Sequence, residues 1–96
     1  MTYDLEVKNE ANVEIIEAYL YYEEKRKGLG EEFLEHLDAY FDRITVNPKH
    51  FPQKRKPYRE AFLKRFPFLV IYEITKSKVI VYSVFNTWQN QEKKKK

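Results

Sequence analysis

A cluster of basic side chains between positions 54 and 65 contains the residues best suited to chemistry in this chain. Lysine and arginine side chains can stabilise the negative charge that builds on a phosphate, or can contact an acidic protein segment. Arg59, Lys64 and Arg65 are therefore candidates for catalysis. The alternative is that such cations only solubilise strand ends and pair with helix carboxylates, which contributes about 0–1 kcal/mol for each exposed pair. The candidates for binding are Lys54, Arg55, Lys56, Arg59, Arg65 and Trp88.

The other side chains that could do chemistry are isolated. The chain has no cysteine, which excludes disulfides and thiolate chemistry. His36 and His50 lack the neighbours of a catalytic triad or of a metal site, so we expect no metal and no cofactor. We expect His36 on the surface or at the edge of an apolar helix stripe. Trp88 could stack on a base, but a single tryptophan after a strand more often covers the core, and we expect that role.

The two halves of the chain carry opposite charge. Residues 1–46 contain five basic and twelve acidic residues, whereas residues 47–96 contain thirteen basic and three acidic residues. The formal net charge of +3 conceals this asymmetry, which predicts one acidic and one basic face. A basic face can meet nucleic acid or an acidic protein segment. The alternative is that solvated helices are rich in glutamate and loops in lysine, with no functional consequence.

A short strand and a helix begin the set of elements that must position these side chains. Tyr3–Val7 alternates apolar and polar residues, which is typical of a strand. A helix then runs from Asn9, its expected N-cap, to about Lys27, and Gly28 ends it. We expect its buried stripe to consist of Val13, Ile16 and Leu20, widened by Ile15, Tyr19 and Tyr22.

A second helix is predicted from Leu29 or Gly30 to the residues before Asn47-Pro48. Proline cannot continue the hydrogen-bond ladder, so the helix ends there. Because the turn between the two helices is short, they should form an antiparallel hairpin. The apolar stripe of the second helix consists of Phe33, Leu34, Leu37, Phe41 and Ile44.

After a predicted loop at residues 47–57, the apolar period changes from helical to strand-like. We expect strands at Tyr58–Lys64, Phe68–Ile74 and Val79–Phe85, with a break at residues 65–67 and a turn at residues 75–78. The apolar density of the last two strands predicts central positions in the sheet. The order β-α-α-β-β-β predicts an α+β fold, with the helix hairpin packed on one face of a mostly antiparallel sheet. The other face of the sheet stays available for a partner.

The chain is predicted to form one domain over residues 3–90. We expect residues 91–96, which end in four lysines, to be a disordered basic tail. Residues 1–10 are too charged for a signal peptide, and no apolar run reaches the ~20 residues of a membrane helix. We therefore expect a cytoplasmic protein that does not bind membranes.

Several segments together identify a family. They are Tyr19-Leu20-Tyr21-Tyr22-Glu23-Glu24, Arg26-Lys27-Gly28-Leu29-Gly30-Glu31-Glu32-Phe33, Asn47-Pro48, Phe51-Pro52, Tyr58-Arg59, Leu63-Lys64-Arg65-Phe66-Pro67-Phe68, Ile71-Tyr72 and Val79–Phe85. In this order and combination the chain resembles toxins of the RelE/ParE superfamily, over residues 3–90. The resemblance implies a toxin of a type II toxin–antitoxin system, which a cognate antitoxin wraps and holds inactive.

The family divides into two modes of action, and the resemblance favours one of them. Some members resemble ribosome-dependent mRNA endonucleases, whereas ParE-type members act on DNA gyrase and are not nucleases. The nuclease branch carries alternating lysines on the first strand after the helices, an arginine on the next strand, and basic residues after the last strand. The matching positions here are Glu60, Phe62 and Leu69, and residues 86–90 are uncharged.

A carboxylate, a ring and an aliphatic side chain cannot replace cations as phosphate stabilisers. The resemblance therefore implies a toxin that acts by binding, in the ParE manner. The alternatives are a RelE-type endoribonuclease with unusual basic residues, and a non-toxic remnant that only binds its antitoxin. Whether the chain is an enzyme stays open at this point.

Overall fold

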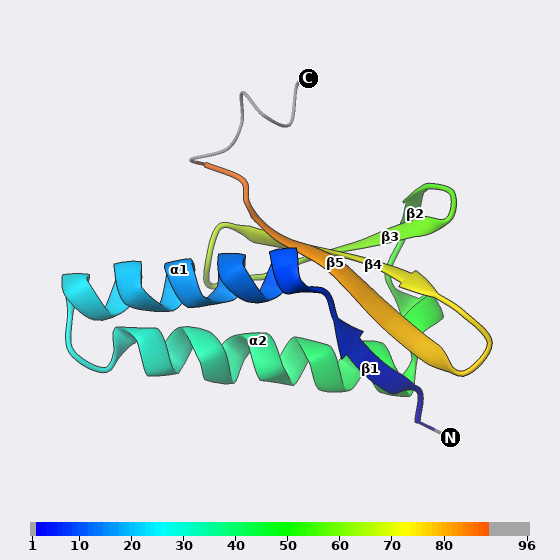
Figure 1. Cartoon of the computed structure of the whole chain (residues 1–96), viewed down its shortest axis with the longest axis horizontal. Helices are drawn as coiled ribbons and strands as arrows, with labels where there is room; N and C mark the ends of the chain where they lie inside the picture. The colour runs from blue at the N-terminus through cyan, green and yellow to red at the C-terminus, as the bar shows by residue number, and fades with distance from the viewer. Residues whose placement is uncertain (1, 89–96) are drawn as a thin grey trace.

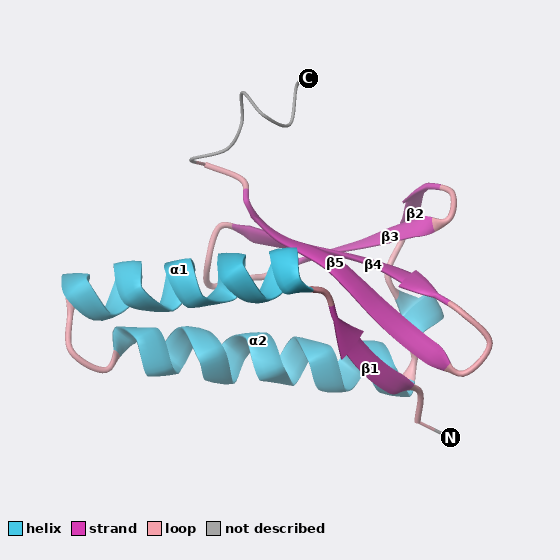
Figure 2. Ribbon diagram, viewed as in Figure 1, coloured by secondary structure: helices cyan, strands magenta, loops and turns pink. Residues whose placement is uncertain are grey.

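The computed structural model describes residues 2–88, which form a helix hairpin and a five-stranded sheet (Figures 1 and 2). The helices lie antiparallel along one side of the sheet (Figure 1). This arrangement confirms the predicted α+β class and the packing of the hairpin on one sheet face. The elements are β1 (Asp4–Val7), α1 (Asn9–Lys25), α2 (Leu29–Val46), β2 (Gln53–Arg55), β3 (Tyr58–Phe62), β4 (Phe68–Ile74) and β5 (Lys78–Asn86).

The strand order is β1-β5-β4-β3-β2, so the two most apolar strands are central, as predicted. Every neighbouring pair is antiparallel except β1 and β5, which run parallel. The pairing of β4 with β5 shifts register between Ile71 and Tyr72, where β5 carries a bulge. A bulge increases the local twist of a strand.

Side chains from the inner sheet face and from α2 fill the core. The predicted α2 stripe is confirmed, since four of its members are buried and Leu34 is partly buried. Tyr22 of α1 joins an aromatic group at one end of the core, with ring centroids 4.9 Å from Phe66 and 5.5 Å from Phe33. The inner sheet face contributes Ala61, Phe68, Val70, Tyr72, Val79, Val81 and Val84.

The predicted buried stripe of α1 is wrong for three of its six members, whereas Ile15 and Tyr22 are partly buried against the core. Val13, Ile16 and Leu20 are 53%, 57% and 59% exposed. The helix instead packs through Ala11 and Ala18, which are 0% and 6% exposed. Small side chains let the helix axis approach the sheet closely, so the opposite, larger apolar stripe is turned outward.

The ends of α1 also differ from prediction. Asn9 is the first helical residue and not the N-cap, because Lys8 occupies the cap position without a side-chain hydrogen bond. The helix ends at Lys25 instead of Lys27, and Arg26 is the C-cap. Gly28 adopts the left-handed conformation (φ 88°) in the turn, as a helix stop requires.

The segment predicted as a loop at residues 47–57 contains structure. Pro48–His50 form a short 3₁₀ helix, and β2 adds an edge strand to the sheet. The buried hydroxyl of Tyr72 donates a hydrogen bond to the carbonyl oxygen of Pro48, which ties this segment to β4. Burial raises the pKa of Tyr72 to about 12. The predicted strand Tyr58–Lys64 is shorter, since β3 ends at Phe62.

Candidate functional site

The sheet face opposite the helices is built from alternate residues of the three longest antiparallel strands. Ala61, Val70 and Val84 are aligned across the sheet and belong to the core. Successive side chains of a strand point to opposite faces. The residues next to these three in the sequence therefore point away from the helices. The rows on this open face are Phe62–Leu69–Phe85 and, on β3 and β4, Glu60–Ile71.

A hollow of about 380 Å³ lies on the open face. Leu69 lies outside the main core cluster but is only 1% exposed, and it lines this hollow. The hollow therefore has an apolar floor. Its lining residues are Lys54, Arg55, Tyr58, Glu60, Leu69, Ile71 and Phe85.

The positions that matched the nuclease residues by resemblance all point to this face. Glu60 and Leu69 line the hollow, and Phe62 stands beside Leu69 in the same row. No cation occupies these central positions. Lys54 and Arg55 reach the hollow only from β2 at its margin. Such a surface can hold an apolar side chain, but it lacks a central group that stabilises a phosphate.

Arg59, a candidate for catalysis and binding, lies on the other side of the sheet. Its register partner is Tyr72, which faces the helices. The Arg59 guanidinium donates hydrogen bonds to the carbonyl oxygens of Phe51 (2.7 Å) and Lys49 (3.3 Å). These contacts hold the 3₁₀ segment against β3, and they direct the guanidinium away from the open face.

Arg65 and Lys64 follow β3 in the bend before β4. The Arg65 guanidinium forms an ion pair with Glu32 of α2 (2.9 Å) and lies 5.4 Å from the centre of the Phe66 ring. Its backbone N–H donates to Nε2 of His36 (3.4 Å). The structure thus brings Arg65 to the helix hairpin and not to Lys54 and Arg55. Lys64 and Lys56 are exposed.

Trp88 does not cover the core, contrary to expectation, since it is 75% exposed. It lies at one margin of a second hollow, whose other lining residues are Tyr21, Tyr22, Arg65, Phe66, Pro67 and Asn86. Two of the predicted binding residues, Arg65 and Trp88, therefore line the same hollow. The remaining cluster, Lys54 and Arg55, belongs to the open face.

Both histidines pack against aromatic side chains. His36 is partly buried against Tyr40 and Phe66, which confirms its place at a stripe edge. Burial lowers its pKa, and the positive charges of Arg65 and Arg43 add to the effect. The rings of His50 and Phe51 make an edge-to-face contact at 5.1 Å. Within residues 2–88 no cluster of side chains is suited to hold a metal ion.

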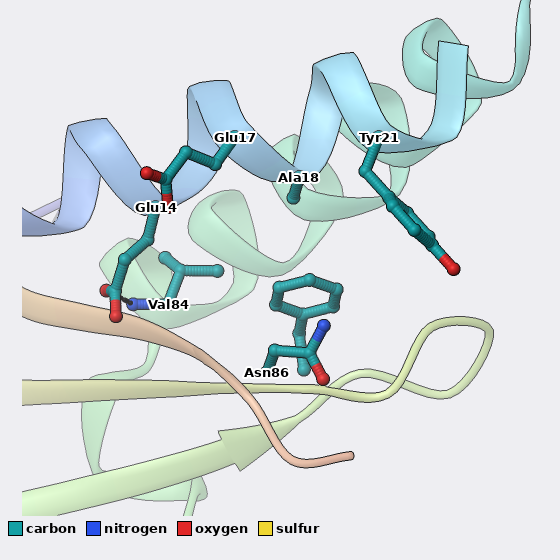
Figure 3. A pocket seen from close by; sticks show the side chains of 7 residues that line it. Glu14, Glu17, Ala18, Tyr21, Val84 and Asn86 are labelled. Carbon is teal, nitrogen blue, oxygen red and sulfur yellow. Dashed lines mark hydrogen bonds between the residues drawn. The ribbon is translucent and has the colours of Figure 1, made fainter. Parts of the chain in front are cut away.

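A third hollow, between α1 and β5, has the carboxylate of Glu14 among its lining groups (Figure 3). Glu14 extends from α1 toward Val84, where it accepts hydrogen bonds from the Val84 backbone N–H and the Ser83 hydroxyl, both at 2.9 Å. β1 pairs with β5 only as far as Val81. Glu14 therefore satisfies an edge N–H that β1 does not reach, and we assign it a structural role.

The outward face of α1 is a second candidate surface. Val13, Ile16 and Leu20 are spaced as in the a and d positions of a heptad repeat. Glu10, Glu17 and Glu24 form an exposed row beside them at intervals of seven residues, and they take part in no ion pair within residues 2–88. We call these six residues the α1 seam. The sequence contained the pattern, but it was interpreted as the core stripe.

The sequence model of the family described as "ParE toxin of type II toxin-antitoxin system, parDE" matches residues 5–90. A solved chain of the chromosomal ParDE TA system from P. aeruginosa has the same fold, with a TM-score of 0.77. That likeness covers 88% of this chain and 96% of the other at 11% identity. No curated protein matches the sequence significantly. Within residues 2–88 no helix is long and apolar enough to cross a membrane.

Proposed function

Because this chain belongs to the ParE toxin family of type II toxin–antitoxin systems, we propose that it arrests growth by binding a protein target of the DNA gyrase type. A cognate antitoxin neutralises it in the cytoplasm. The observation that carries the proposal is the chemistry of the open face. Its centre is formed by Glu60, Phe62 and Leu69, where RNA cleavage would need cations.

The two arginines proposed for catalysis support the same conclusion. Arg59 holds the 3₁₀ segment through two backbone carbonyls, and Arg65 is paired with Glu32. A guanidinium already engaged in the fold must break these contacts before it can meet a scissile phosphate. We therefore assign Arg59 and Arg65 to positioning of the fold, and Lys54 and Arg55 to contact with the target.

The α1 seam supplies a surface for the antitoxin. Heptad-spaced apolar residues on an exposed helix are suited to an amphipathic partner helix. The glutamate row beside them favours a partner helix with lysine or arginine flanks. Two copies of α1 packed antiparallel would bring their glutamate rows together, so a second copy of this chain fits less well than an antitoxin.

Expression of the chain in bacteria tests the mode of action. We expect growth arrest without fragments of translated mRNA, together with inhibition of supercoiling by purified gyrase. We also expect an antitoxin gene directly beside the toxin gene, whose coexpression restores growth. Cleaved mRNA with normal supercoiling activity would contradict the proposal. A chain that binds its antitoxin but never slows growth would be a non-toxic remnant.

The alternative function is ribosome-dependent mRNA cleavage. It is favoured by a single feature, namely that Glu60, a possible base, shares the hollow with Lys54 and Arg55. In that case Glu60→Gln would abolish mRNA cleavage while the protein stays folded. Under the binding mode the same variant keeps its effect on growth, because binding requires no proton transfer by Glu60.

A further inference from the structure

The charges around the open face are unevenly distributed. Toward β1, the carboxylate of Glu6 is paired with Lys8 (3.0 Å) and Lys78 (3.3 Å), and hydrogen bonds from these two lysines hold its pKa below the ordinary value. Nearby, Glu73 accepts a hydrogen bond from the hydroxyl of Tyr82 (2.7 Å). The carboxylates of Glu6 and Glu73 are therefore already satisfied by neighbours.

Toward β2 the charges are not satisfied. Lys54 and Arg55 form no ion pair with any residue in the described range 2–88, and both line the hollow. The floor between the two sides is apolar, since Leu69 is buried and Ile71 and Phe85 are partly buried. A ligand for this surface must combine an apolar side chain with negative charge on the β2 side.

We infer that the hollow binds an acidic segment of the toxin's protein target, anchored by a bulky apolar side chain that sits over Leu69. This inference rests on the proposed binding mode and adds the surface and the chemistry of the partner. A nucleic acid fits less well. Its phosphates would find cations only at one margin, and Glu60 would repel a backbone that crossed the centre.

The source of the segment is the target and not the antitoxin. The α1 seam carries an unpaired glutamate row and lies on the helix side of the sheet, whereas the open face carries unpaired cations and lies on the other side. The two surfaces select partners of opposite charge. One basic amphipathic helix satisfies the α1 seam, and a different, acidic partner satisfies the open face.

Charge reversal at the margin of the hollow tests the inference with the full chain and purified gyrase. The double variant K54E/R55E should bind gyrase about tenfold more weakly, or worse, because electrostatic attraction becomes repulsion. The matched control K49E/K76E makes the same change in net charge at exposed lysines outside the hollow, and should stay within about twofold of the wild type. Equal affinity of K54E/R55E and wild-type chain overturns the inference.

A second measurement separates failure of this inference from failure of the proposed function. Isotope-labelled toxin is titrated with a synthetic glutamate-rich peptide that carries two phenylalanines, with its lysine counterpart, and with oligouridine. The acidic peptide should shift the NMR signals of Leu69, Ile71 and Phe85, and the other two should not. This result supports the surface even if gyrase proves not to be the target. Shifts caused by oligouridine, or a concentration-dependent self-association through this face, overturn it.

Discussion

At the scale of single residues, the alternation of side chains along β3 decides which cations can reach the open face of the sheet. Ala61 and Leu63 are buried, so Arg59 shares their side of the strand, whereas Glu60 and Phe62 take the other side. This distinction was available from the sequence, because apolar residues of one parity indicate the inner face. The partners of Arg59 were not available. The carbonyls of Lys49 and Phe51 approach only after an irregular segment has folded, and no periodicity describes such a segment.

Tyr72 offers a test of how that segment is held. Its hydroxyl donates a hydrogen bond to the carbonyl oxygen of Pro48, and the side chain is fully buried. Tyr72→Phe should lower the free energy of unfolding by about 1–3 kcal/mol, because a buried carbonyl loses its hydrogen bond. Urea denaturation at neutral pH measures the change. A loss well below this range would mean that water replaces the hydroxyl.

The same residue predicts a pH dependence. The pKa of Tyr72 is raised to about 12 in the folded chain, from an ordinary value of 10.0. The neutral phenol is therefore favoured by folding. Its contribution is complete below about pH 10 and is lost as the pH rises toward 12. Between these values the wild type should lose more stability than Tyr72→Phe, which has no phenol at this site. Parallel slopes for the two proteins would contradict the assignment.

At the scale of elements, the helix hairpin depends on close approach at Gly30. A Cβ at this position would lie 2.8 Å from the backbone oxygen of Tyr19 and 2.9 Å from Oε1 of Glu23. Glu23 in turn accepts hydrogen bonds from the N–H groups of Gly28 and Gly30. The glycine is needed for contact between helices, not for its own backbone conformation, since of the two glycines only Gly28 has a positive φ.

Gly30→Ala should destabilise the fold although alanine is the better helix former. The clash costs about 1–3 kcal/mol, which exceeds the gain of about 1 kcal/mol in helix propensity. The matched control is Ala39→Gly, at an exposed position of the same helix, which should lose only the propensity of about 1 kcal/mol. Thermal unfolding of both variants compares the two effects. A stabilised Gly30→Ala would show that the helices can separate freely.

The predicted burial of Val13, Ile16 and Leu20 in α1 is wrong, and the reason is the packing of the helix against the sheet. Its sequence carries two apolar stripes, and the larger one was expected to be buried. The distance between helix and sheet decides otherwise, because alanine at positions 11 and 18 permits an approach that larger side chains would block. A single helix contains no information about that distance. By contrast, α2 carries one stripe only, and its burial was predicted correctly.

Substitution in the α1 seam should affect binding and leave stability unchanged. Leu20 is 59% exposed, so Leu20→Glu should change the free energy of unfolding by less than about 0.5 kcal/mol. It should nevertheless weaken the antitoxin complex by about tenfold or more, because a charge enters an apolar contact. Val46→Glu is the control, since Val46 is 65% exposed but lies at the end of α2. Calorimetric titration with the antitoxin compares the two, and equal losses would exclude the seam as the docking surface.

At the scale of the whole molecule, the charge asymmetry of the sequence becomes two surfaces. The acidic half of the chain contains both helices, and the basic half contains four of the five strands. Because the hairpin covers one side of the sheet, the difference in charge between the two halves of the sequence becomes a difference between the helix layer and the sheet layer. The asymmetry favours one acidic and one basic face, which stays a prediction. It did not reveal that several cations, Arg59 and Arg65 among them, are bound within the fold.

Two separate surfaces predict that toxicity and neutralisation can be lost independently. The triple variant Glu10→Lys, Glu17→Lys, Glu24→Lys should remain toxic and resist the antitoxin, since a basic partner helix would meet like charge. K54E/R55E should lose toxicity and still bind the antitoxin. The two sets of positions lie on different elements, α1 and β2, so the effects of the two sets on each complex should add within about 0.5 kcal/mol. Growth curves with and without antitoxin separate the variants. If reversal on either side abolished both properties, a single partner would span both faces, and the opposite charges would then belong to two segments of one antitoxin.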